Sequence, residues 1–163
     1  MVFIVTGASG HIGNQVVRTL LQQGYEVKVL ARNPLAQFQG KAVVVTLGDL
    51  TDPDFLNREI RISDIVIHAV GYIDLHNSDY DKSVEANLTT AQVMADVCKD
   101  RGARLVYIST ADIIDKEDEG IIEEPVTFKT IDPSDHYAYT KKEATLYVRK
   151  TIKSGLSGVI LYP

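Results

Sequence analysis

The sequence contains little of what secreted and membrane proteins require. Cys98 is its single cysteine, so no internal disulfide can form, and this favours a reducing compartment, which we expect to be the cytoplasm. No apolar run approaches the ~20 residues of a membrane-spanning helix, and the N-terminus lacks the basic segment and cleavage site of a secretory signal. We therefore expect a globular protein with no membrane partner.

Closely spaced metal ligands and basic clusters are also missing. The four histidines have no ligand-like spacing, which argues against a metal site. The net charge is −5, and nothing resembles a basic groove, so we expect no nucleic-acid partner. The acidity is concentrated at residues 112–124, where only Lys116 opposes the acids. We interpret this stretch as a solvated loop, with a substrate-facing loop as the alternative.

Short apolar runs alternate with helical patterns along the whole chain. The runs are rich in Val and Ile and apolar at consecutive positions, as strands buried on both faces require. We expect strands at residues 2–6, 26–31, 42–47, 64–70, 105–109 and 158–162. We expect helices at residues 11–23, 53–60, 78–101 and 136–154. This alternation predicts a single α/β domain over residues 1–163, a doubly wound parallel sheet with helices on both faces.

The first predicted strand runs directly into a glycine-rich turn and then into a helix. Gly7 can take a tight turn, Gly10 lets backbone amides approach a phosphate, and Gly13 lets the helix pack closely. The first-turn amides and the positive end of the helix dipole then face a pyrophosphate. The expected cofactor contacts of this loop are Gly7, Ser9, Gly10, His11, Ile12 and Gly13. A glycine-rich connection without a ligand is the alternative.

A tyrosine and a lysine are spaced to share one helix face. Tyr137 and Lys141 are four positions apart, so the lysine ammonium can lie near the phenol. A positive charge there favours the phenolate and lowers its pKa from ~10, which suits proton transfer to a carbonyl or from an alcohol. Such pairs are common on helix surfaces, so a structural role is the alternative.

Two adjacent hydroxyls end the fifth predicted strand. Ser109 and Thr110 follow the buried run of residues 105–108, at the sheet edge where parallel sheets bind ligands. A hydroxyl there can stabilise the oxygen that becomes negative during hydride transfer. The alternative is that both residues only cap the strand.

Together, residues 6–13, 48–50, 108–110 and 137–141 resemble the extended short-chain dehydrogenase/reductase superfamily, the NAD-dependent epimerase/dehydratase group, whose fold is the Rossmann fold. The resemblance implies that Thr110 binds the substrate carbonyl, Tyr137 is the general acid/base, and Lys141 tunes Tyr137 and holds the nicotinamide ribose. It also implies a catalytic role for Asn87, beside the nicotinamide, and cofactor contacts for Asp49, Leu50, Ala69, Val70, Gly71 and Tyr162. Family members continue well beyond residue 163, so we expect the substrate-binding part to be absent from this chain.

The cofactor choice follows from Arg32. Residues 29–34 and 48–53 are similar to the dihydroflavonol-reductase-like branch, which implies reduction of a ketone or aldehyde with NADPH. NAD-specific folds place an acid about 20 residues beyond the glycines. This chain has no acid in residues 27–41, and a guanidinium suits a 2′-phosphate. We therefore favour NADP over NAD, with a solvated Arg32 as the alternative.

Three functions are compatible with these residues. The favoured one is an NAD(P)-dependent oxidoreductase that acts on a small-molecule carbonyl or alcohol. The second is a nucleotide-sugar epimerase or dehydratase with tightly bound NAD. The third is a non-catalytic NAD(P)-sensing or protein-binding module, against which the retention of Thr110, Tyr137 and Lys141 argues. The resemblance also implies a possible homodimer formed through the helix that carries Tyr137.

Overall fold

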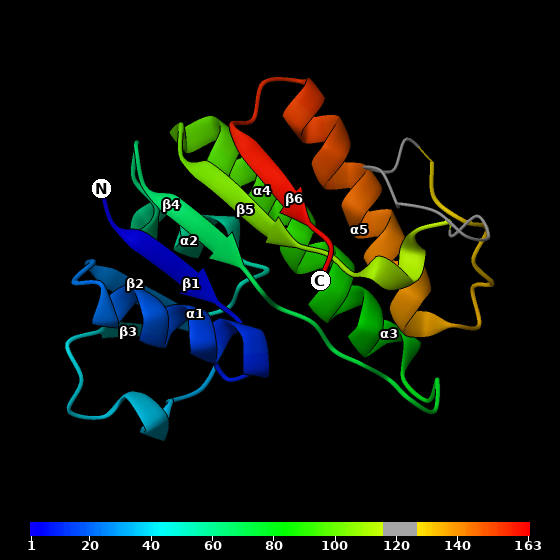
Figure 1. Ribbon diagram of the computed structural model, residues 1–163. Helices are drawn as coiled ribbons and strands as arrows, with labels where there is room; N and C mark the ends of the chain where they lie inside the picture. Colours follow the sequence, from blue (N-terminus) through cyan, green and yellow to red (C-terminus); the bar gives the residue numbers. More distant parts are fainter. Residues whose placement is uncertain (116–126) are drawn as a thin grey trace.

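A six-stranded parallel sheet forms the centre of the molecule (Figure 1). The computed structural model describes residues 1–115 and 127–163, so most of the predicted acidic loop lies outside the described residues. The strand order is β3-β2-β1-β4-β5-β6. The strands are β1 (Phe3–Thr6), β2 (Val27–Ala31), β3 (Val44–Leu47), β4 (Ile65–His68), β5 (Arg104–Ile108) and β6 (Gly158–Leu161).

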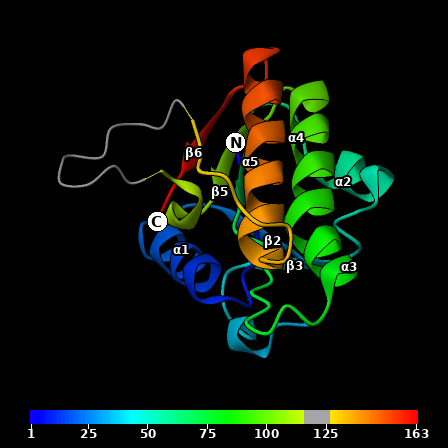
Figure 2. The same ribbon diagram turned by 90° about the vertical axis from the view of Figure 1, so that its right-hand side faces the viewer.

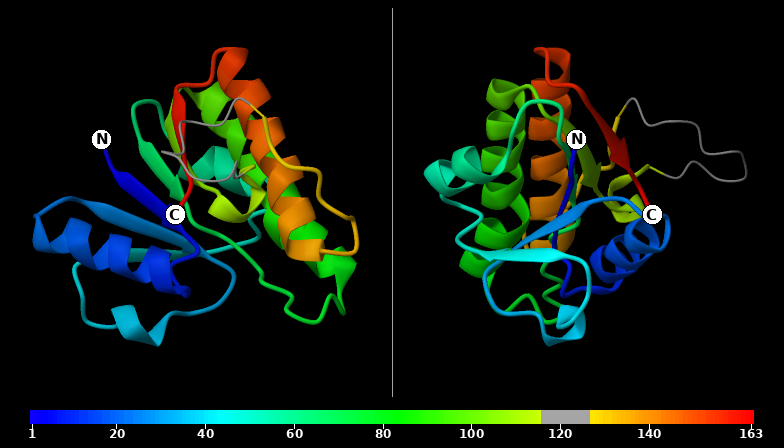
Figure 3. Two further views of the ribbon diagram at one scale, coloured as in Figure 1. Left: turned by 45° about the vertical axis from the view of Figure 1, so that its right-hand side comes forward. Right: turned by 90° about the vertical axis from the view of Figure 1, so that its left-hand side faces the viewer.

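Helices cover both faces of the sheet, as predicted. They are α1 (His11–Gln22), α2 (Pro53–Glu59), α3 (Tyr80–Ser83), α4 (Thr90–Arg101) and α5 (His136–Lys153), with short helical segments η1 (Ala36–Phe38), η2 (Val84–Thr89) and η3 (Ala111–Ile113). Helices α2, α4 and α5 pack on one face, and α1 packs on the other (Figures 2 and 3). The chain is therefore the doubly wound α/β fold that the alternation predicts.

Strand alternation divides the core between the two faces. Ile4, Leu30 and Val66 face α2 and α4, whereas Val5 and Val29 face α1. Because successive side chains of a strand point to opposite faces, β1, β2 and β4 each contribute to both clusters. This double burial explains why the strands read as continuous apolar runs.

Two predicted elements differ in detail from the structure. The strand predicted at residues 64–70 ends at His68, so residues 69–71 leave the sheet and become available to a ligand. The helix predicted at residues 78–101 begins at Tyr80 and passes through the π-helical segment η2 before α4. π-Helical turns are rare and are often found at functional sites. The predicted start of α2 is confirmed, because Asp52 accepts a hydrogen bond from the Asp54 amide and proline follows it.

Candidate functional site

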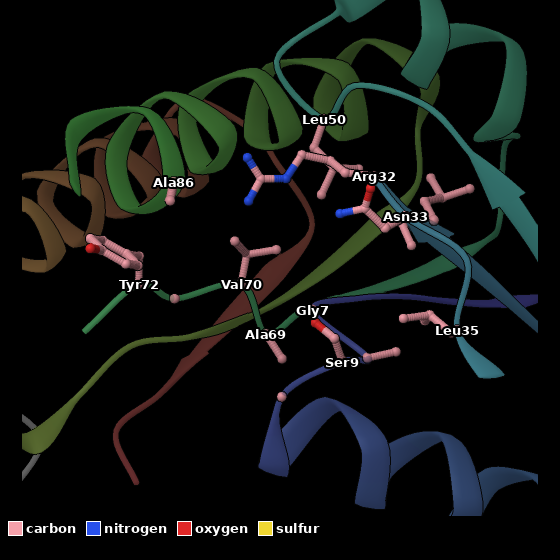
Figure 4. Close-up of a pocket in the computed structure, with 15 residues that line it drawn as sticks. Gly7, Ser9, Arg32, Asn33, Leu35, Leu50, Ala69, Val70, Tyr72 and Ala86 are labelled. Carbon is pink, nitrogen blue, oxygen red and sulfur yellow. The ribbon is translucent and has the colours of Figure 1, made fainter. Parts of the chain in front are cut away.

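A cleft opens where the strand order reverses, beyond the carboxyl ends of β1, β2 and β4 (Figure 4). Open parallel sheets bind their ligands at this position. The predicted cofactor contacts that line it are Gly7, Ser9, Gly10, Arg32, Leu50, Ala69, Val70 and Gly71. The prediction missed Ala8, Leu30, Ala31, Asn33, Leu35, Tyr72 and Ala86. Each missed residue lies within a few positions of a predicted one in the sequence. Including the residues that flank each motif would therefore have identified them.

The glycine turn is fixed by contacts that leave no room for side chains. Gly7 has a positive φ of 74°, and a Cβ atom on it would collide with the Ala69 carbonyl. A Cβ on Gly13 would collide with the carbonyl of Gly7, so α1 packs directly against the turn that precedes it. At Gly10 the nearest atom to a Cβ would be the Gly7 oxygen at 3.4 Å. The loop is therefore tight beside β4 and less crowded at Gly10, which lines the cleft.

The first turn of α1 supplies unpaired amides beside the cleft. The Gly10 amide donates to the Gly7 carbonyl at 3.0 Å and is used within the turn. Helix geometry leaves the amides of His11, Ile12 and Gly13 without an intrahelical acceptor, and the N-cap Gly10 has no side chain that could accept from them. These donors and the helix dipole fit a diphosphate. The side chains of His11 and Ile12 line a separate groove along α1, so only their backbones can serve the cleft.

Arg32 meets an acid that is distant in sequence. Its Nη1 lies 3.1 Å from Oε1 of Glu85 on η2, and both side chains are about half exposed. Residues 27–41 contain no acid, but the fold brings the carboxylate of Glu85 to the Arg32 guanidinium. Asp49 accepts two hydrogen bonds from Thr51, and these bonds together with Arg32 lower its pKa. Asp49 does not line the cleft, whereas the adjacent Leu50 does.

Tyr137 and Thr110 meet at the carboxyl end of β5, at the start of α5. Burial raises the pKa of Tyr137 above 10.0, a hydrogen bond with Thr110 lowers it, and the charge of Asp112 raises it. The Thr110 hydroxyl also donates to Asp112 Oδ2 at 3.0 Å and accepts from the Asp112 amide at 3.2 Å. Thr110 thus caps η3 and lies close enough to Tyr137 to lower the pKa of its phenol, whereas a contact with a substrate oxygen stays a prediction. Asp112, interpreted as part of a solvated loop, belongs to this site.

Lys141 does not act on Tyr137 as predicted. Its Nζ donates to the Ile108 carbonyl at 2.7 Å and lies 4.6 Å from the centre of the Tyr107 ring. Burial of the ammonium lowers its pKa to about 7. The predicted lowering of the Tyr137 pKa by Lys141 is wrong for this structure, because that pKa is raised and Lys141 is not among its causes. Helical spacing brings the two residues to one face, but the long lysine side chain turns toward β5.

Asn87 joins three elements through its side chain. It accepts from the Tyr72 amide at 2.7 Å, and its amide group donates to the Tyr72 carbonyl and to Thr140 Oγ1, each at 3.0 Å. Thr140 in turn donates to the His136 carbonyl at 2.6 Å, beside Tyr137. Every polar atom of the Asn87 side chain is thus used within the protein. The geometry gives it a positioning role between the cleft wall and the tyrosine, instead of contact with a reacting atom.

A second contact fixes the start of α5. His136 Nδ1 lies 3.3 Å from Asp74 Oδ2, and the His136 amide donates to the Asn77 side-chain oxygen at 3.0 Å. The Asp79 amide lowers the pKa of Asp74 well below its usual value, so this carboxylate is ionised at neutral pH. Because His136 precedes Tyr137, the loop after β4 helps to place the phenol.

Other predicted residues lie in the core or apart from the cleft. The Ser109 hydroxyl is buried and lies 2.7 Å from Thr145 Oγ1, so it faces the core and not the sheet edge. His68 is a core histidine, and its Nδ1 lies 2.8 Å from Thr6 Oγ1. Tyr162 follows β6 and packs against Phe128, with ring centres 6.2 Å apart, and is not among the residues that line the cleft.

Residues 1–115 and 127–163 contain neither a metal-ligand cluster nor a helix that could span a membrane. No group of three or more potential ligands among the histidines, cysteines and acids is placed to hold a metal ion. None of the described helices combines the length and apolar character needed to cross a membrane.

Similarity to known proteins agrees with this geometry. Residues 3–163 match the model of a family described as the NAD dependent epimerase/dehydratase family. Sterol demethylase protein B of Methylococcus capsulatus is 25% identical over 100% of this chain and 51% of its own length. The 2-alkyl-3-oxoalkanoate reductase of Stenotrophomonas maltophilia is 29% identical over 100% of this chain and 50% of its own length.

The fold is also found in solved structures. A short-chain dehydrogenase/reductase superfamily protein from Agrobacterium tumefaciens, solved with bound NAD, has a TM-score of 0.82 at 24% identity. The match covers 99% of this chain and 48% of that one. The chain spans about half the length of the relatives it matches. With a family match across residues 3–163, the chain belongs to the NAD-dependent epimerase/dehydratase family.

Proposed function

We propose that the protein is an NAD(P)-dependent oxidoreductase acting on a carbonyl or alcohol, with Tyr137 as the general acid/base. A bound nicotinamide dinucleotide would supply or accept the hydride. The observation that carries the proposal is the placement of Thr110, directly after β5, and Tyr137, in the first turn of α5, at the sheet edge that also holds the glycine loop. Two hydroxyls at that edge can orient a substrate oxygen and exchange a proton with it.

Each residue has a distinct part in this proposal. The amides of His11 and Ile12 bind the diphosphate, and Tyr137 donates or removes the proton of the substrate oxygen. Thr110 donates its hydroxyl proton to that oxygen in place of Asp112, which accepts it in the structure. Burial keeps the phenol protonated at neutral pH, so it can donate a proton to the oxygen of a carbonyl undergoing reduction. Lys141 lies behind this edge, where its Nζ donates a hydrogen bond to the Ile108 carbonyl.

We favour NADP as the cofactor because Arg32 lines the cleft and its guanidinium can bind a 2′-phosphate in bidentate fashion. One observation favours the other reading. Glu85 already neutralises Arg32, which weakens the case for a 2′-phosphate and supports a nucleotide-sugar epimerase or dehydratase with bound NAD. Both functions use the same residues, so they are separated by whether turnover consumes the nicotinamide cofactor: the oxidoreductase transfers a hydride with net change, whereas the epimerase or dehydratase returns it to the substrate and leaves NAD unchanged.

The test combines binding with turnover. We would titrate the purified protein with NADPH and NADH, following nicotinamide fluorescence, and then assay a panel of ketones and aldehydes by nicotinamide absorbance. The proposal expects saturable binding and a measurable oxidation of NADPH or NADH, with Tyr137→Phe retaining binding but losing turnover by about 10²-fold or more. Turnover that survives in Tyr137→Phe would contradict the assignment of the acid/base. Bound NAD that purifies with the protein and is never released would favour the epimerase or dehydratase.

A further inference from the structure

The Arg32–Glu85 pair joins two walls of the cleft. Arg32 follows β2 directly and lines the cleft, and Glu85 lies on η2 next to Ala86, which lines the opposite wall. Arg32 Nη1 and Glu85 Oε1 are 3.1 Å apart. Figure 4 shows the guanidinium extending from the β2 side toward the helical segment that carries Ala86. A carboxylate therefore occupies one side of the group that would receive a 2′-phosphate.

The pair changes what Arg32 can do for a nucleotide. A guanidinium offers several donors in one plane, and a phosphate takes two of them in its best geometry. Glu85 accepts from one of these donors, so a 2′-phosphate must share the guanidinium or displace the carboxylate. The carboxylate would also repel the phosphate charge. A ribose hydroxyl meets neither obstacle, because it is neutral and can accept from Arg32 or donate to Glu85.

Resting on the proposed function, we infer that Glu85 is a specificity-determining residue that limits the preference for NADP over NAD. It supplies by tertiary contact the acid that is missing from residues 27–41, where dinucleotide-binding folds commonly carry it. Asp49, whose carboxylate also interacts with Arg32, adds a second negative charge near the guanidinium. Arg32 alone would select strongly for a 2′-phosphate, whereas the pair admits both nucleotides.

The expected effect is moderate because the pair is solvated. The two side chains are 54% and 56% exposed, and exposed ion pairs change affinities by about two- to fivefold. We therefore expect Glu85→Gln to tighten the binding of a ligand with a 2′-phosphate by about two- to fivefold. The binding of its 2′-hydroxyl counterpart should not tighten, because a hydroxyl can donate to Glu85. The gain should shrink as salt rises from low to physiological concentration.

The experiment uses two probes that differ only in the 2′-phosphate, adenosine 2′,5′-bisphosphate and adenosine 5′-monophosphate. Isothermal titration calorimetry would give the ratio of their dissociation constants for the wild type, Glu85→Gln and Glu85→Lys. The lysine variant should shift the ratio further toward the bisphosphate. Glu26→Gln is the matched control, because it removes the same charge just before β2, at the opposite end of the strand from the cleft.

The outcomes separate this inference from the proposed function. A ratio that moves toward the bisphosphate in both Glu85 variants and stays constant in Glu26→Gln supports the inference. A ratio unchanged in both, or moved equally by Glu26→Gln, overturns it while leaving the proposed function in place. If the wild type binds neither probe and neither NADPH nor NADH, both the inference and the proposed function are contradicted.

Discussion

The glycine loop after β1 and the tyrosine site at the start of α5 occupy the same edge of the sheet but are built differently. Residues adjacent in sequence make the loop, and its shape depends on a backbone that passes too close to Ala69 for any side chain at Gly7. The tyrosine site is assembled from β5, η2, α5 and the loop after β4 by side-chain hydrogen bonds such as those of Asn87. A side chain added to the glycine loop should therefore cause a large loss of stability in one step. A single substitution in the tyrosine site should cause a smaller loss, because several hydrogen bonds share the work of positioning it.

The largest effect is expected at Gly7. Gly7→Ala places a Cβ in collision with the Ala69 carbonyl and forces alanine into a φ of 74°, so we expect a loss of about 3 kcal/mol or more in the free energy of unfolding. Nucleotide binding should disappear with it. Gly24→Ala is the matched control, since Gly24 has a φ of 79° but nothing within 4 Å of an added Cβ, and it should cost only ~1 kcal/mol. Equal losses in urea unfolding would contradict the steric argument.

The next largest effect concerns the Asn87 contacts. Asn87→Ala leaves the Tyr72 amide and carbonyl without their partner and removes the hydrogen bond that the Thr140 hydroxyl accepts, and should cost about 2–4 kcal/mol in the free energy of unfolding. A double-mutant cycle with Thr140→Val should show a coupling energy of ~1 kcal/mol, because the two side chains are in direct contact. Additive losses would mean that Asn87 and Thr140 act independently, and that α5 is placed by other contacts.

Lys141 gives a pH dependence with a definite sign. Its pKa falls from 10.5 in the unfolded chain to about 7 when buried, so the folded state carries the full cost of the buried ammonium below pH 7 and none above pH 10.5. Lys141→Met removes this cost. Relative to the variant, the wild type should therefore gain a few kcal/mol in the free energy of unfolding as pH rises through this window. A difference that does not change between pH 6 and pH 10 would show that the ammonium is not desolvated.

The smallest effects are expected at the two neighbours of Tyr137, and they should have opposite signs. Asp112→Asn removes a negative charge and should lower the pKa of the phenol, whereas Thr110→Val removes a hydrogen bond and should raise it. Ultraviolet difference titration of each variant against its Tyr137→Phe counterpart isolates this one phenol. Shifts in the same direction would mean that the Thr110–Asp112 contact reorganises when either residue is changed.

The features that could be predicted from the sequence are those made by residues close together in the chain. Gly7, Gly10 and Gly13 lie within one strand-turn-helix unit, so their spacing alone indicates their geometry. The contact between Arg32 and Glu85 spans 53 positions, and the turn of Lys141 toward Ile108 depends on how deeply α5 packs against β5. Periodicity shows which face of a helix a residue shares, but not where a long side chain ends. The homodimer and the cytoplasmic location stay predictions.

The central claim is that the glycine loop and the tyrosine site form one catalytic centre. The most direct test is a crystal structure of the protein with NADPH. We expect the pyrophosphate to lie on the first-turn amides of α1 and the nicotinamide to lie beside Tyr137 and Thr110. A dinucleotide bound through the loop with its nicotinamide directed away from Tyr137, or bound elsewhere on the molecule, would contradict it.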